Sequence, residues 1–296
     1  MRILILGGTG ILGHQLYKHM SSHFPDTFAT IRQSRTKYQL SNITDESKII
    51  ECVDVTEFHI LTGIMNSVKP DVILNCTGFT KRRKDVNEVI NSIKLNALFP
   101  HLLAEWGRNN SVRVINFSTD CVFDGMTGNY SDVSPTNAVD LYGKTKAIGE
   151  IRGENALTLR SSFIGTELEN GTELLEWFLG QTGGTVRGFK NAIYSGLTTL
   201  ELSRVIEKII IHYPGANGIY NVSSDPISKY ELLLLIRDKM HLNVEVLPDE
   251  NVICDRSLNS SKFRQEFNYV PPRWELMIDE LARSIYSKKE KNERNF

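Results

Sequence analysis

The chain has 296 residues, of which 41% are hydrophobic and 23% are charged, and its formal net charge is −1. This length suits one large α/β domain with a smaller appendage, and the near-neutral charge offers no basic surface for nucleic acid. Its four cysteines are scattered and indicate reduced thiols, so we predict neither disulfides nor a bound metal. We find no signal peptide and no apolar run of roughly 18 residues, and we therefore expect a cytoplasmic protein without a membrane segment.

A predicted buried strand followed at once by a glycine-rich loop opens the sequence. Residues Arg2–Leu6 are apolar without alternation, as in a parallel strand buried on both faces, and a helical pattern then continues to about Phe24. The loop Gly7-Gly-Thr-Gly-Ile-Leu-Gly13 is a G-x-x-G-x-x-G variant of the dinucleotide fingerprint, in which glycines let the backbone approach a pyrophosphate. An ordinary glycine-rich turn is the alternative, but the strand–loop–helix context favours nucleotide binding. The predicted contacts are Gly7, Gly10, Ile11, Leu12 and Gly13.

The end of the second predicted strand indicates which dinucleotide is preferred. This strand spans about Thr27–Ile31 and ends at Arg32-Gln-Ser-Arg35, where an NAD enzyme usually has an acidic residue for the ribose 2′-hydroxyl. No acid occurs between Asp26 and Asp45, whereas arginine pairs well with a 2′-phosphate. We therefore predict NADP(H) at Arg32 and Arg35, with NAD(H) as the less favoured cofactor. A solvated turn without a binding role is the alternative.

Two further predicted strands bring loops to the same edge of the sheet. The third strand is about Ile49–Val53, and Asp54 and Val55 at its end are predicted to face the adenine. The fourth strand, Asp71–Asn75, follows a helix of about Glu57–Val68 and leads into the turn 75–80 at a carboxyl end, where open α/β sheets bind ligands. Two interpretations of the basic run Lys81-Arg-Arg-Lys84 are open: it is solvated surface, or it attracts a sugar diphosphate. A long helix carrying Asn96 should then break near Pro100.

Tyr142 is the one tyrosine of the chain with a lysine four residues later, Lys146. On a helix this spacing places both side chains on one face, and an ammonium beside a phenol is expected to lower the pKa of the phenol. A phenol tuned in this way can exchange a proton with a carbinol oxygen. Thr119 closes the predicted strand Val112–Ser118, so that its hydroxyl can hold the same oxygen from the other side.

The order of elements predicts an α/β fold with a doubly wound parallel Rossmann sheet and a smaller mixed α/β C-terminal region. We assign residues 1–165 to the dinucleotide-binding domain, to which later segments return, 166–287 mainly to substrate binding, and 288–296 to a charged, frayed tail. The pattern after residue 165 predicts four helices, at about 171–181, 199–213, 228–240 and 274–286, and short strands at 219–222 and 244–246. Ser228 and Glu231 form a plausible capping box.

Four segments resemble the extended short-chain dehydrogenase/reductases, and within them the dTDP-4-dehydrorhamnose reductase family. These segments are Gly7–Gly13, Ser118–Gly125, Tyr142–Lys146 and Leu159–Gly165. The resemblance implies that Thr119, Tyr142 and Lys146 are the catalytic residues and that Lys146 also holds the nicotinamide ribose. It further implies a cofactor site that includes Cys76, Thr77, Gly78 and Asn96, together with the catalytic Tyr142 and Lys146.

One departure from the family pattern bears on the substrate. Family members usually read Ser-Thr-Asp-Tyr-Val-Phe-Asp-Gly where this chain has Cys121 in place of the tyrosine. We interpret Cys121 as a pocket residue, because no histidine lies nearby in sequence to activate it as a nucleophile. The predicted substrate-binding residues are Cys121, Ser162, Phe163 and Arg256, with Lys229 and Trp177 as further candidates.

The resemblance implies NADPH-dependent reduction of the C4 ketone of a nucleotide-activated 4-keto-6-deoxy sugar, in cell-surface polysaccharide biosynthesis. The expected partners are this nucleotide sugar and a second copy of the chain in a homodimer. Two alternatives remain: an epimerase that retains its NAD, and an NADP-binding regulatory subunit similar to the beta subunit of methionine adenosyltransferase. A 4,6-dehydratase is disfavoured, because such enzymes carry Thr-Asp-Glu where this chain has Thr119-Asp-Cys121.

Overall fold

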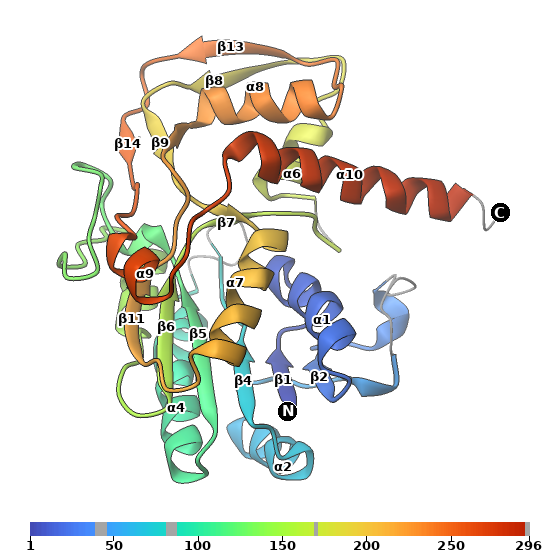
Figure 1. Ribbon diagram of the computed structural model, residues 1–296, viewed down its shortest axis with the longest axis vertical. Helices are drawn as coiled ribbons and strands as arrows, with labels where there is room; N and C mark the ends of the chain where they lie inside the picture. Colours follow the sequence, from blue (N-terminus) through green and yellow to red (C-terminus); the bar gives the residue numbers. More distant parts are fainter. Residues whose placement is uncertain (39–45, 81–87, 169–170, 294–296) are drawn as a thin grey trace.

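A parallel sheet forms the centre of the molecule (Figure 1), in a computed structural model that describes residues 1–38, 46–80, 88–168 and 171–293. Within this part of the chain the sheet has seven strands in the order β11-β6-β5-β4-β1-β2-β3, and every pairing is parallel. The strands are β1 (Ile3–Leu6), β2 (Thr27–Thr30), β3 (Ile49–Ile50), β4 (Val72–Asn75), β5 (Arg113–Ser118), β6 (Ala156–Arg160) and β11 (Gly218–Asn221). The predicted doubly wound Rossmann topology is confirmed, and its switch point lies between β1 and β4.

Helices on both faces of the sheet explain why its strands are continuously apolar. Ile3 and Leu4 are neighbours on β1 but belong to different buried clusters, because successive side chains of a strand point to opposite faces. The cluster of Ile3 includes residues of α1 and α7, and that of Leu4 includes residues of α2 and α4. These helices are α1 (Ile11–His23), α7 (Thr199–His212), α2 (Phe58–Val68) and α4 (Phe99–Asn109).

The smaller C-terminal region lies beyond the carboxyl ends of the strands (Figure 1). A parallel pair, β8 (Thr185–Phe189) and β13 (Glu245–Asp249), packs on α8 (Lys229–Lys239). Next to this pair, β9 (Ala192–Tyr194) lies between β12 (Ile227–Ser228) and β14 (Cys254–Asp255). The remaining elements are β7 (Phe163–Ile164), β10 (Leu197–Thr198), α6 (Leu174–Leu179), α9 (Ser261–Glu266) and α10 (Trp274–Glu293). Although α7 and β11 come late in the sequence, β11 is a strand of the main sheet and α7 packs against that sheet. The chain therefore crosses between the main sheet and the C-terminal region more than once.

The predicted break at Pro100 is wrong. The helix starts as α3 (Val89–Ser92), continues as a π-helical segment (Ile93–Leu98) and passes directly into α4. Pro100 lies inside this continuous run of helical residues, directly after the π-helical segment. The predicted frayed tail is also wrong for residues 288–293, because α10 continues through a run of good helix formers to Glu293.

The predicted capping box at the start of α8 is confirmed. The Ser228 hydroxyl accepts from the backbone N–H of Glu231 at 3.1 Å, and the Glu231 carboxylate accepts from the backbone N–H of Ser228 at 3.2 Å. The sequence pattern did not reveal β8, β9, β14 or α9, because short segments carry too little periodicity. The basic run Lys81–Lys84 lies outside the described residues.

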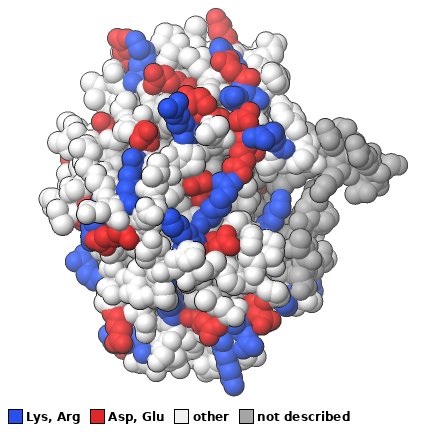
Figure 2. Space-filling view, in the orientation of Figure 1, with Lys and Arg blue, Asp and Glu red and all other residues white. Residues whose placement is uncertain are grey.

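Among the helices that the structure describes, none combines the length and the apolar character needed to cross a membrane. On the face shown in Figure 2, basic and acidic side chains are interspersed. This mixture agrees with the formal net charge of −1.

Candidate active site

The glycine loop forms a tight cradle between β1 and α1. Gly7 has φ +81°, a left-handed conformation that favours glycine, and its carbonyl oxygen accepts from the N–H of Gly10 at 3.1 Å. A Cβ on Gly13 would lie 2.1 Å from this same oxygen, so only glycine allows α1 to approach the loop this closely. Gly10 caps α1 without a side chain, which leaves the first-turn N–H groups of Ile11 and Leu12 facing the loop. The cradle fits the pyrophosphate of a dinucleotide.

The end of β2 carries an ion pair that the sequence pattern did not indicate. The Arg35 guanidinium pairs with the carboxylate of Glu51, which follows β3, and the backbone N–H of Arg35 donates to that carboxylate at 2.7 Å. This backbone hydrogen bond is the main reason why the pKa of Glu51 is lowered. Arg32 is exposed at the end of β2. Of the two arginines, Arg35 is therefore already paired with an acid of its own chain.

The loops after β3 and β4 place the other predicted cofactor residues at the same edge of the sheet. Asp54 accepts from the N–H and the hydroxyl of Thr56 and forms the turn before α2, and Val55 is buried. Thr77 donates its hydroxyl to the Asn75 side chain at 2.6 Å, and the Cys76 backbone contacts Gly7. These contacts hold the loop after β4 against the glycine cradle.

Asn96 fixes that loop to the helix that carries Lys146. Its oxygen accepts from the N–H of Phe79 at 2.8 Å, and its nitrogen donates to the Phe79 carbonyl at 3.1 Å and to the Thr145 hydroxyl at 3.3 Å. These bonds engage both amide hydrogens. Asn96 thus orients the segment that includes Gly78, whereas its direct contact with a cofactor stays a prediction.

The three predicted catalytic side chains lie where β5 approaches α5 (Leu141–Ile148). Thr119 directly follows β5, and its hydroxyl hydrogen-bonds the phenol of Tyr142 in the first turn of α5. Lys146 lies one turn further along this helix, is buried, and donates from Nζ to the carbonyl oxygen of Phe117 at 2.6 Å. A strand end and one helix face therefore present a hydroxyl, a phenol and an ammonium to the same site.

The pKa of Tyr142 differs from the sequence-based prediction. Burial raises it well above the ordinary value, the charges of Cys121 and Asp120 raise it further, and the hydrogen bond with Thr119 opposes this rise. The Lys146 ammonium turns instead to the Phe117 carbonyl, and burial lowers the pKa of Lys146 to about 8. The prediction that Lys146 depresses the pKa of Tyr142 is therefore wrong in this structure, and Tyr142 is a protonated phenol.

Cys121 lies close enough to Tyr142 for its charge to act on the pKa of the phenol, and its role as a pocket residue stays a prediction. A Cβ on Gly143 would lie 2.2 Å from the Cys121 carbonyl oxygen, so this glycine lets α5 pack directly on the segment 119–121. The Arg256 Nε donates to the Phe123 carbonyl at 2.9 Å, and its charge interacts with those of Cys121 and Asp120. Arg256 thus comes close to the reaction site from a position far along the sequence.

Ser162 and Phe163 follow β6, and the Ser162 carbonyl lies near Tyr194, a residue that the sequence analysis did not identify. The Ser162 carbonyl accepts from the N–H of Leu197 at 3.0 Å, and β7 pairs with β10. The pKa of Tyr194 is raised by burial and by the charges of Asp120, Glu173 and Cys121, the same charges that act on Tyr142. No local motif marks Tyr194, because its neighbours come from distant parts of the chain.

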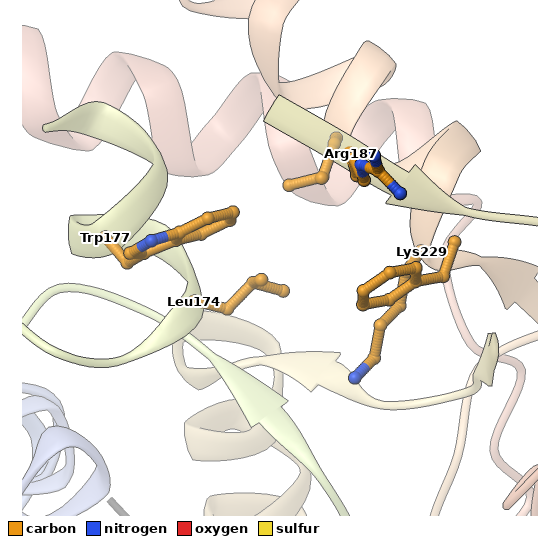
Figure 3. A pocket seen from close by; sticks show the side chains of 6 residues that line it. Leu174, Trp177, Arg187 and Lys229 are labelled. Carbon is orange, nitrogen blue, oxygen red and sulfur yellow. The ribbon is translucent and has the colours of Figure 1, made fainter. Parts of the chain in front are cut away.

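Two of the further substrate candidates, Trp177 and Lys229, line one pocket (Figure 3). This pocket has a volume of about 310 Å³ and lies between α6, β8 and the start of α8. Figure 3 shows the Trp177 ring on one side and the Arg187 and Lys229 side chains on the other. Its lining residues are Leu174, Trp177, Arg187, Phe189, Lys229 and Leu233. The pocket therefore combines an aromatic face with two basic side chains, of which Arg187 is paired with Asp249 at 3.2 Å.

A cluster of metal-ligating residue types lies on the surface where α1 meets α7. In the described part of the chain, His19, His23 and Glu207 bring one ligand atom each to within 4.8 Å of one another. The His19 Nε2 lies 2.7 Å from the Glu207 carboxylate, as in a hydrogen bond between the two helices. This pairing accounts for the cluster, and we assign no metal to it.

Comparison with known proteins gives relatives along the whole chain. The dTDP-4-dehydrorhamnose reductase of Aggregatibacter actinomycetemcomitans is 27% identical, with 95% of this chain and 98% of that protein covered. A hypothetical dTDP-4-dehydrorhamnose reductase from Sulfolobus tokodaii has a solved structure with a TM-score of 0.73 and 26% identity, covering 90% and 94% of the two chains. The structure of the dTDP-4-dehydrorhamnose reductase of Bacillus anthracis in complex with NADP has a TM-score of 0.77 at 20% identity. The shared fold covers 95% of this chain and 98% of that chain.

A different kind of relative matches part of the chain. The methionine adenosyltransferase 2 subunit beta of Danio rerio is 30% identical over 50% of this chain and 42% of its own length. The family profile of the RmlD substrate binding domain, in contrast, matches residues 1–286. The predicted resemblance to the dTDP-4-dehydrorhamnose reductases is thereby confirmed, and the chain belongs to the RmlD substrate binding domain family.

Proposed function

We propose that this chain reduces the C4 ketone of a nucleotide-activated 4-keto-6-deoxy sugar with NADPH, in cell-surface polysaccharide biosynthesis. The observation that carries the proposal is the meeting of Thr119 and Tyr142 with Lys146 one helical turn away, and the charge of Lys146 acts on Cys76, whose backbone lies against Gly7 of the glycine cradle. The full-length similarity to a dTDP-4-dehydrorhamnose reductase supports it. The proposal includes a homodimer as the functional form.

The roles of the chain's own residues follow from their protonation and position. The bound nicotinamide would supply the hydride to the carbonyl carbon. Tyr142 is kept protonated by burial and would donate its proton to the C4 oxygen, while the Thr119 hydroxyl hydrogen-bonds that oxygen. Lys146 would hold the nicotinamide ribose and add positive charge near the forming alkoxide, below its pKa of about 8.

We assign the nucleotide part of the substrate to the pocket of Trp177, Arg187 and Lys229. An indole ring offers a stacking surface to a planar base, and the two cations attract a diphosphate. Glu173, whose charge acts on Tyr142, directly precedes Leu174 of this pocket. The base would then lie beyond the sugar, on the side away from the glycine cradle.

The test is a panel of nucleotide 4-ketosugars with different bases and sugar substituents, assayed by NADPH oxidation. Turnover of at least one member, with loss of the 4-keto group in the product, is the expected result. A purified protein that carries tightly bound NAD and interconverts sugar epimers without net oxidation of NADPH would instead support the epimerase alternative.

A regulatory subunit is the second candidate function, and it rests on the similarity to methionine adenosyltransferase 2 subunit beta over half of the chain. It predicts NADP binding without turnover of any ketosugar, and co-purification of a synthetase. The intact set of Thr119, Tyr142 and Lys146 favours the enzyme, because a purely regulatory role makes no use of a proton donor.

We expect NADPH to support turnover better than NADH, because basic side chains at the end of β2 favour a 2′-phosphate. Arg32→Ala should reduce kcat/KM for NADPH more than Arg35→Ala does, because Arg35 is paired with Glu51. Neither change should impair the use of NADH, and Arg283→Ala on the exposed face of α10 is the control. Equal efficiency of the wild-type protein with both cofactors would contradict the predicted preference.

Cys121→Tyr should change the choice among sugars and leave cofactor binding unaltered. Tyrosine adds a ring and a hydroxyl beside Tyr142, whereas cysteine leaves space for a bulky substituent such as a 2-acetamido group. The measurement is the ratio of kcat/KM for dTDP-4-dehydrorhamnose to that for a UDP-2-acetamido-4-keto sugar. The substitution should move this ratio towards dTDP-4-dehydrorhamnose, and an unchanged ratio would show that position 121 does not contact the sugar.

A further inference from the structure

Tyr194 has a buried hydroxyl without a hydrogen-bond partner among the described residues. Its ring is well held, at 5.6 Å from the ring of Trp274, whose indole nitrogen in turn donates to the Asp225 carbonyl at 2.8 Å. Buried hydroxyls in proteins are normally paired, because burying one without a partner costs stability. Phenylalanine would pack here equally well without this cost. A partner for this hydroxyl is therefore expected from outside the described residues.

The surroundings of this hydroxyl identify where such a partner would lie. A Cβ on Gly196 would be 2.2 Å from the Tyr194 hydroxyl and 2.4 Å from the Ser162 carbonyl oxygen, so this hydroxyl lies close to the strand that continues into Phe163. The charges of Asp120, Glu173 and Cys121 act on both Tyr194 and Tyr142. The two phenols thus share one acidic neighbourhood.

Tyr194 is also linked through its strand to a residue of the nucleotide pocket. It is the last residue of β9 and is paired with Ile227, two residues before Lys229 of the pocket. Glu173, whose charge acts on both phenols, directly precedes Leu174 of the pocket. Tyr194 is therefore linked to both sites, through its strand partner and through the charges that act on its phenol.

We propose that Tyr194 is a specificity-determining residue whose hydroxyl donates a hydrogen bond to a polar substituent of the sugar ring, a hydroxyl or an acetamido oxygen. This inference rests on the proposed nucleotide-sugar function. Tyr194 positions the ring and does not transfer the proton, because Thr119 hydrogen-bonds Tyr142 and not Tyr194. Burial and the neighbouring acids keep the Tyr194 phenol protonated, so that it acts as a donor.

The test is Tyr194→Phe, measured with the 4-ketosugar that the wild-type protein reduces best. We expect the melting temperature to be unchanged or higher and the NADPH affinity to be unchanged, because Tyr194→Phe removes no hydrogen bond to a described residue and relieves the cost of an unpaired buried hydroxyl. KM for the sugar nucleotide should rise about tenfold, the size expected for the loss of one hydrogen bond between uncharged groups. The change in kcat should be smaller than the change in KM.

Tyr269→Phe is the matched control, because Tyr269 is also buried but its hydroxyl is paired with the Glu201 carboxylate at 3.0 Å. It should lower the melting temperature and leave KM unaltered. The reverse pattern for Tyr194→Phe, a lower melting temperature with unchanged KM, would assign Tyr194 a structural role and overturn the proposal.

A set of substrate analogues, each lacking one ring substituent, identifies the contacted group. The wild-type protein should discriminate against one of these deoxy analogues, and Tyr194→Phe should remove that discrimination. Equal discrimination by both proteins would overturn the inference while leaving the reductase function intact. Failure of the wild-type protein to reduce any 4-ketosugar would instead overturn the proposed function, and this inference with it.

Discussion

Tyr142→Phe is expected to lower kcat by about 10²–10⁴-fold, because it removes the proton donor and keeps the ring. Thr119 and Lys146 remain in place in this variant, so the affinity for NADPH should be nearly unchanged. The measurement pairs NADPH oxidation in the presence of the 4-ketosugar with a fluorescence titration of NADPH binding. A variant that retains tens of per cent of the wild-type kcat would show that another group provides the proton.

Tyr286→Phe provides the control for this substitution. Its hydroxyl donates to the Met240 carbonyl at 2.5 Å, in the C-terminal region, and it plays no part in the proposed site. Loss of this bond should cost about 1 kcal/mol of stability and leave kcat unaltered. The contrast separates the loss of a proton donor from the loss of any tyrosine hydroxyl.

Gly13→Ala is expected to abolish NADPH binding at concentrations that saturate the wild-type protein. The added Cβ would lie 2.1 Å from the Gly7 carbonyl oxygen and 2.9 Å from its carbonyl carbon, and these atoms are backbone. The loop or α1 must therefore shift, which displaces the N–H groups that face the pyrophosphate. NADPH titration and thermal unfolding measure the two consequences, and we expect a fall in melting temperature as well.

Gly63→Ala is a matched control within the same domain. Gly63 lies inside α2, and a Cβ there meets no atom within 4 Å. Since alanine is the better helix former by about 1 kcal/mol, this variant should be as stable as the wild-type protein or more stable, with unchanged NADPH affinity. If Gly13→Ala behaved like Gly63→Ala, the close approach of α1 to the loop would not be needed for binding.

Local rules account for the features that the sequence predicted well. The glycine loop is read from its own spacing and from the apolar strand before it, and the structure places Gly7, Gly10 and Gly13 in one tight cradle. Helical geometry alone places Tyr142 and Lys146 one turn apart on α5. The capping box of Ser228 and Glu231 is equally local. Each of these features depends on residues a few positions apart.

Features that the sequence pattern missed or misjudged depend on distant residues. Glu51 pairs with Arg35 because β2 and β3 are neighbours in the sheet. Asn96 fixes the segment around Phe79 across a gap of 17 positions. The Lys146 ammonium turns to the Phe117 carbonyl, 29 positions away, rather than acting on Tyr142. Sequence spacing indicates which side chains share a helix face. It does not indicate with which distant group a charged side chain forms a hydrogen bond or an ion pair.

The sequence by itself therefore determined the fold class and the position of the glycine loop, and it predicted the catalytic residues, because strand burial and helix periodicity depend on residues that are close in the sequence. Only the tertiary structure decided how the substrate side of the site is assembled. Tyr194 and Arg256 come from separate segments of the C-terminal half, and both lie within range of the charges of Asp120 and Cys121, because the chain crosses between the main sheet and the smaller region. Their proximity, and the burial that keeps both Tyr142 and Tyr194 protonated, arises from long-range packing that no local pattern encodes.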